Sequence, residues 1–128
     1  MLKFEQKFCT ELQKWIKYNM KSTFCWEAKI CEGKNLNYKN HFPEHQIRNL
    51  KICGRHFIYK ISDADALCQK PFDGVSITEA PGYFFIQFKK PIFYIIEVSI
   101  LESEIQSGSK SLTEQCAKKI SYRIGELK

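Results

Sequence analysis

The chain has 128 residues, a length that suits one domain with one core, and its apolar residues form no run near the ~20 that a membrane-spanning helix needs. We therefore expect a single domain over residues 1–128 that lies outside the membrane. The first residues mix charges with apolar side chains, unlike a signal peptide, so we expect the protein to stay in the cytoplasm. The net charge of +6 favours an anionic partner, most commonly nucleic acid, and the scattered cysteines, which lack metal-ligand spacing, are expected to be reduced thiols.

The first half of the chain predicts a helix, a strand, a loop and a second helix. Apolar residues recur at helical intervals over 2–20, which predicts an amphipathic helix. A strand is expected over 24–30, and the polar run 32–40 predicts a loop. Pro43 suits the first turn of the second helix, and Gly54 would end it.

The second half predicts mainly strands. Runs rich in aromatic and β-branched residues predict strands over 55–61, 72–78, 83–88 and 92–101. Residues 103–110 have the composition of a linker. A capping-box pattern at 111–114, followed by apolar residues at helical spacing as far as Ile124, predicts a last helix.

An acid and a base share one face of the first predicted strand. Glu27 and Lys29 are two residues apart, so they project together while Ala28 faces the packed side. A carboxylate is a hard oxygen ligand for Mg²⁺, and a nearby ammonium can stabilise charge that develops on a phosphate, with Asp73 as the further carboxylate. The alternatives are a surface ion pair, worth about 0.2–1 kcal/mol, and a turn at Asp73.

Five pieces of sequence, spread from Phe4 to Ile100, form a familiar set. They are Phe4-Glu5, Glu27-Ala28-Lys29, the helix over 42–50 with its His45-Gln46 pair, the stretch from 59 to Asp73, and the paired strands over 83–97. Together they resemble the PD-(D/E)xK nuclease superfamily, and within it the phage-type Holliday junction resolvases. The resemblance implies an α/β, restriction-endonuclease-like fold, a mixed β-sheet flanked by helices. Because Asp73 follows Glu27, whereas the family places its Pro-x-Asp strand first, we expect a permuted strand order.

The resemblance also assigns roles to residues. Asp73 and Glu27 would hold Mg²⁺, with Mn²⁺ as an alternative, Lys29 would stabilise the transition state, and Gln46 would orient the attacking water. Additional candidates are Glu5, His45 and Asp63, although Asp63 also fits a polar turn and His45 equally fits a structural or DNA-contacting role. Phosphate contacts are expected from Lys34, Lys39, Lys60 and Lys70.

The resulting expectation is a metal-dependent, structure-selective DNA endonuclease. It would cut branched or duplex DNA and act as a homodimer, because resolving a junction takes two symmetric cuts. A composition rich in lysine, asparagine and isoleucine is typical of an AT-rich genome, such as that of a phage or virus.

Three alternatives stay open. In the first, Gln87-Phe88-Lys89 is the true counterpart of the Glu-x-Lys motif, and the site has lost a metal ligand. In the second, the chain is a noncatalytic nucleic-acid-binding or interaction module on the same fold. In the third, it is a nuclease that acts on flaps, single strands or RNA.

Overall fold

A four-stranded mixed sheet forms the centre of the protein. The computed structural model describes residues 3–20, 24–52, 57–60, 74–77 and 80–127. The strand order is β1-β5-β6-β8, in which β1 runs parallel to β5 and the other neighbours are antiparallel. These strands are β1 (Cys25–Ile30), β5 (Gly82–Lys89), β6 (Ile92–Glu97) and β8 (Arg123–Glu126). The strands β1 and β8 therefore lie at the two edges, and the expected mixed α/β sheet is confirmed.

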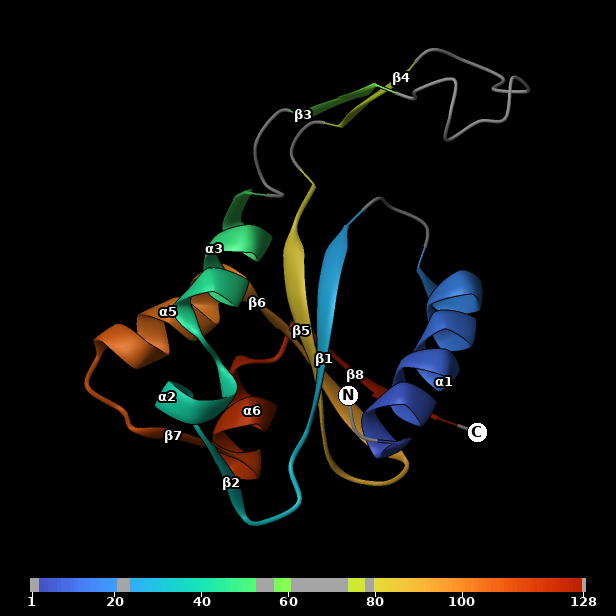
Figure 1. The fold of residues 1–128 in the computed structure, drawn as a ribbon. Coiled ribbons are helices and arrows are strands. Elements are labelled where there is room, and N and C mark those ends of the chain that lie inside the picture. Colours follow the sequence, from blue (N-terminus) through green and yellow to red (C-terminus); the bar gives the residue numbers. More distant parts are fainter. Residues whose placement is uncertain (1–2, 21–23, 53–56, 61–73, 78–79, 128) are drawn as a thin grey trace.

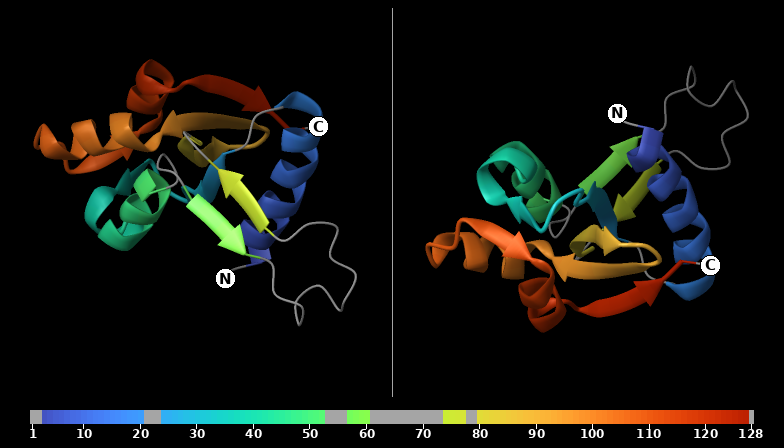
Figure 2. Two further views of the ribbon diagram at one scale, coloured as in Figure 1. Left: turned by 90° about the horizontal axis from the view of Figure 1, so that it is seen from above. Right: turned by 90° about the horizontal axis from the view of Figure 1, so that it is seen from below.

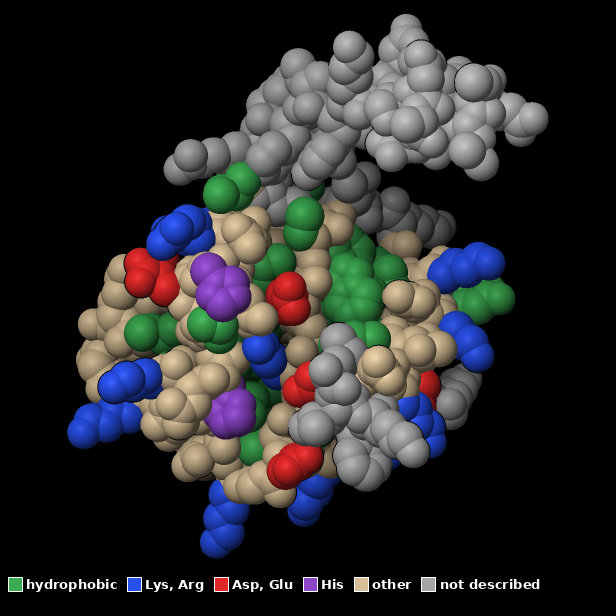
Figure 3. All heavy atoms as spheres, viewed as in Figure 1, with side chains coloured by type: hydrophobic (Ala, Val, Ile, Leu, Met, Phe, Trp, Pro, Cys, Tyr) green, Lys and Arg blue, Asp and Glu red, His purple; other side chains and the backbone are tan. Residues whose placement is uncertain are grey.

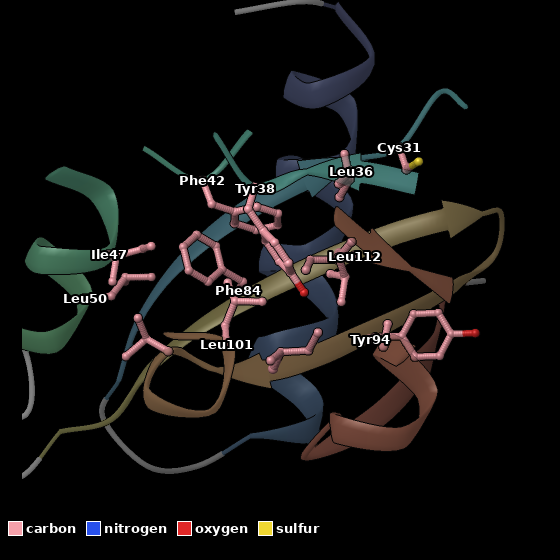
Figure 4. Close-up of a cluster of buried hydrophobic side chains, with 14 residues drawn as sticks. Cys31, Leu36, Tyr38, Phe42, Ile47, Leu50, Phe84, Tyr94, Leu101 and Leu112 are labelled. Carbon is pink, nitrogen blue, oxygen red and sulfur yellow. The ribbon is translucent and has the colours of Figure 1, made fainter. Parts of the chain in front are cut away.

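Helices cover both faces of this sheet (Figures 1 and 2). Phe8 and Leu12 of α1 (Lys3–Asn19) pack on one face against Tyr83 and Phe85 of β5. The other face, with Phe84 at its centre, carries α2 (Tyr38–His41), α3 (Glu44–Ile52), α5 (Val98–Gln106) and α6 (Glu114–Ile120). Figure 4 shows this second core. Because successive strand residues point to opposite faces, a strand apolar on both faces can serve both cores.

Two short antiparallel ladders complete the fold. The strand β2 (Asn35–Asn37) pairs with β7 (Ser111–Thr113), and Leu36 lies directly opposite Leu112, with both side chains buried. This pair joins the two halves of the chain beneath the second core. The strand β3 (Phe57–Lys60) pairs with β4 (Gly74–Ile77), and Figure 1 shows this hairpin apart from the central sheet.

Most predicted elements exist with small shifts at their ends, but four predictions in the second core region are wrong. The expected loop over 32–40 contains β2 and α2, and the expected strand over 92–101 ends at Glu97, where α5 begins. The linker predicted over 103–110 starts inside α5. The last helix ends at Ile120, so Ile124 belongs to β8. Thr113 caps this helix, and its Oγ1 accepts a hydrogen bond from the Cys116 N–H at 3.1 Å.

The cysteines differ in state. Cys25 is disulfide-bonded, which corrects the expectation of reduced thiols, whereas Cys9, Cys31 and Cys116 are free. Among the described helices, none has the length and apolar composition needed to cross a membrane.

Candidate functional site

The predicted Glu-x-Lys pair lies on β1, an edge strand of the sheet. Trp26, Ala28 and Ile30 pack into the core beneath α1, whereas Cys25 packs against the opposite core. Strand alternation therefore directs Glu27 and Lys29 toward the face that carries α2 and α3. Both side chains are half-buried.

Lys29 is held in a partly desolvated position. Its Nζ lies 6.0 Å from the centre of the Phe42 ring, which is 3% exposed. Burial lowers the pKa of Lys29, and the negative charges of Glu27 and Glu5 partly oppose this shift. An ammonium in this position is less hydrated than one on the open surface, so its charge acts more strongly on nearby groups.

Glu5 reaches the same region from α1. It lies one helical turn before Cys9. Burial is the largest cause of the raised pKa of Cys9, and the negative charges of Glu5 and Glu27 raise it further. Glu5 and Glu27 also both act on Lys29. The first turns of α1 thus bring a second carboxylate to the edge of the sheet. Figure 3 shows acidic and basic side chains close together between α1 and α3.

The acid and the base do not form the surface ion pair considered from the sequence. In the described part of the chain, the ion pairs within 4.0 Å are Arg48–Glu44 and Lys51–Glu102, and no side-chain hydrogen bond involves Glu27 or Lys29. The two groups affect each other through longer-range electrostatics. The carboxylate oxygens and ammonium hydrogens therefore remain available to other ligands.

Gln46 lies on α3 between two contacts with the sheet. Four residues before it, Phe42 packs against Phe84, the β5 neighbour of Glu27. Four residues after it, Leu50 lies over Gly82 at the start of β5. The half-buried Gln46 side chain thus belongs to the side of α3 that faces the sheet. Its Oε1 is buried and has no hydrogen-bond partner among the described residues.

Of the other predicted site residues, His45, Lys34 and Lys39 have exposed side chains in the described part of the chain. His45 is exposed on α3, and Figure 3 shows histidine side chains over α2 and α3. Lys34 and Lys39 are exposed in the segment that follows β1. Lys60 is the last residue of β3. Three predicted residues, Asp63, Lys70 and Asp73, lie outside the described residues.

The described residues alone do not make a complete metal centre. They contain no group of three or more His, Cys, Asp or Glu side chains placed to hold an ion. Among the described residues, the carboxylates of Glu5 and Glu27 act on the same groups at the β1 edge. Mg²⁺ prefers such donors, so their chemistry fits this ion as part of a ligand set.

The alternative motif at Gln87 has a different environment. Gln87 lies on the inner strand β5, is only 3% exposed, and its Nε2 has no partner among the described residues. Lys89, two residues later, is exposed at the end of the strand. A buried amide cannot reach a solvated ion and a phosphodiester together, so the geometry favours Glu27 over Gln87 as the acidic position.

A groove lies among the helices that cover the second core. This groove of about 680 Å³ runs between α2 and α3 on one side and α5 on the other, with Tyr38, Phe42 and Ile105 in its walls. Glu27 and Lys29 do not line it. Phe42 therefore separates this groove from the β1 edge, and sequence reasoning missed its contact with Lys29.

Comparisons with protein-family models, with curated protein sequences and with solved structures found no match to this chain.

Proposed function

We propose that the protein is a divalent-metal-dependent endonuclease that cuts branched or duplex DNA at the β1 edge. One observation carries the proposal. Glu27 and Lys29 share one face of an edge strand, half-buried, with no ion pair or side-chain hydrogen bond in the described part of the chain. Placing two partly desolvated charges side by side without pairing them is costly in a purely structural role. It is common where charges act on a ligand.

The oxygen donors would hold the ion. We assign Glu27 and Asp73 as its carboxylate ligands, with Mg²⁺ as the ion and Mn²⁺ as an alternative, and Glu5 as a further carboxylate from α1. When bound, such an ion acidifies a water molecule and offsets negative charge on the scissile phosphate.

The other residues act on the water and the phosphate. Lys29 places its ammonium where negative charge grows on the phosphate oxygens, and partial burial strengthens this interaction. Gln46 orients the attacking water through its side-chain amide, which lies on the side of α3 that faces the sheet. Lys34 and Lys39, both exposed, bind phosphates that flank the cut. Symmetric cleavage of a junction would require two copies of the chain.

Cleavage assays on matched substrates test the proposal. A synthetic four-way junction, a duplex of the same sequence, a flap and a single strand are incubated with Mg²⁺, with Mn²⁺ or with chelator. Glu27→Gln and Lys29→Met should each lower the cleavage rate by about 10²–10³. Glu32→Gln is the matched control, because Glu32 is an exposed acid two residues after the end of β1. Wild-type cleavage by Glu27→Gln would reject the assignment.

A noncatalytic nucleic-acid-binding module is the second candidate. The observation that favours it is the absence of a three-ligand metal group within the described residues, in a chain of net charge +6. Such a module would bind DNA equally well with chelator and with Mg²⁺, and Asp73→Ala would leave binding unchanged. A metal-binding isotherm that disappears in Asp73→Ala would favour the nuclease.

A further inference from the structure

Phe42 has little freedom to move. It follows α2 directly, and its ring meets the Phe84 ring edge-on, with the centres 5.0 Å apart and the planes at 89°. The Tyr38 ring packs on it at 5.8 Å. Figure 4 shows Phe42 and Phe84 against one another in the second core. The orientation of the ring is therefore fixed by its packing, and it presents a fixed surface to the Lys29 ammonium.

We propose that Phe42 is a positioning residue, whose ring holds the Lys29 ammonium where it stabilises the negative charge that develops on the phosphate. This inference rests on the proposed endonuclease function. The π-electrons of the ring attract the cation at 6.0 Å, and the effect grows when the cation is partly removed from water, as Lys29 is.

An aromatic ring has an advantage over a carboxylate in this role. A carboxylate at hydrogen-bond distance would fix Lys29, but it would also neutralise its charge and occupy its N–H donors. The ring attracts the ammonium and leaves those donors free for phosphate oxygens. This agrees with the absence, among the described residues, of an ion pair between Lys29 and Glu27 or Glu5.

Phe42 also connects two parts of the site. It precedes α3 by one residue, Pro43, whose carbonyl oxygen accepts a hydrogen bond from the Gln46 N–H at 3.0 Å. The segment that fixes the Lys29 ammonium therefore also begins the helix that carries Gln46. A change that preserves the shape of Phe42 and weakens only its π-electrons separates the two roles.

Fluorinated phenylalanines provide this change. We would replace Phe42 with mono-, di- and trifluorophenylalanine, which reduce the negative potential of the ring face and nearly preserve its shape. The expected result is a stepwise fall in kcat for junction cleavage, about three- to tenfold for the trifluoro variant, with little change in KM. The matched control is the same series at Phe93, which is fully buried among aromatic rings on the opposite face. A flat kcat across the series at Phe42, with thermal stability retained, overturns the proposal.

A second measurement needs neither DNA nor metal. Ring currents from Phe42 should move the Lys29 side-chain proton resonances upfield in the wild type, and this shift should disappear in Phe42→Leu but persist in Phe42→Tyr. No upfield shift in the wild type overturns the contact itself. If the wild-type protein shows the upfield shift but cleaves no DNA, the contact between Phe42 and Lys29 is supported. The proposed function is then rejected, and the positioning role with it. Cleavage without sensitivity to fluorination rejects the positioning role alone.

Discussion

Gly82 controls how closely α3 approaches the sheet. It is the first residue of β5, pairs with Cys25 on β1 and lies beneath Leu50 of α3. A Cβ atom at position 82 would lie 2.8 Å from the Leu50 Cβ and 2.9 Å from the Leu50 carbonyl carbon. Both distances are too short, and a helix backbone cannot rotate away as a side chain can. Gly82→Ala therefore forces α3 outward.

Two opposing effects set the size of the change in stability. Replacing glycine by alanine reduces the entropy of the unfolded chain, which stabilises by about 0.4–1 kcal/mol. Overpacking a core costs about 1–3 kcal/mol, and contact with backbone favours the upper part of that range. The net loss should be about 1–2 kcal/mol. With an unfolding entropy of about 2.1 cal/mol/K per residue over 128 residues, this lowers Tm by about 4–7 °C.

Thermal unfolding followed by circular dichroism measures this loss. Gly33→Ala is the matched control, because Gly33 is exposed and a Cβ there meets nothing within 4 Å, so its Tm should stay the same or rise slightly. Since Gln46 is one helical turn from Leu50, Gly82→Ala should also lower the cleavage rate well below its own Tm. A Tm for Gly82→Ala equal to or above that of wild type would refute the reasoning.

Two further predictions concern a buried phenol and the surface lysines. Tyr94 donates a 2.9 Å hydrogen bond to Glu114, and burial, followed by that hydrogen bond and the charge of Glu114, raises the pKa of Tyr94 to about 12. The folded state thus favours the neutral phenol. The contribution of this phenol to the free energy of unfolding is therefore complete below pH 10 and is lost as the pH rises toward 12. In urea unfolding, wild type should lose more stability than Tyr94→Phe over this interval, and equal losses would contradict the assignment. Lys34→Ala and Lys39→Ala should each reduce the slope of log binding constant against log salt by about 1, whereas Lys14→Ala on α1 should not.

Local pattern was sufficient for the parts of the fold that have a clear period. The apolar spacing of α1 matches its buried residues Phe8 and Leu12. On β1 the alternation of residues predicted that Glu27 and Lys29 share a face while Ala28 packs inward, and the packing agrees. On α1 the apolar residues follow the helical period, and on β1 Trp26, Ala28 and Ile30 alternate with Glu27 and Lys29, so the sequence carries the period that the structure shows.

The errors arise where tertiary contacts decide. The run from Ile92 to Leu101 is apolar except for Glu97 and Ser99, because β6 is buried on both faces and α5 continues directly from it. No glycine or proline marks the change at Glu97. In the polar segment 32–40, β2 exists because Leu36 meets Leu112 from the other half of the chain. A local pattern contains neither fact.

The region of β8 shows the same limit. Ile124 continues the helical spacing of the residues before it, yet the chain turns into an edge strand. A Cβ at the next residue, Gly125, would lie 2.7 and 2.8 Å from two ring carbons of Phe93, so only glycine fits there. The same holds for the site: the buried state of Gln87 and the position of Phe42 depend on neighbours far along the chain.

The charges at the β1 edge suggest an order of binding in the proposed mechanism. Glu5, Glu27 and Lys29 together carry a formal charge of −1, and the proposed ligand Asp73 would bring the sum to −2. A phosphodiester carries −1, so it meets net repulsion before an ion is bound. A divalent cation would bring the local sum to 0, which removes the net repulsion, and its own concentrated charge attracts the phosphate. The unpaired arrangement of Lys29 then contributes, because its charge is not already neutralised by a carboxylate. Metal binding should therefore precede productive binding of DNA at this edge, while Lys34 and Lys39 hold flanking phosphates in either state.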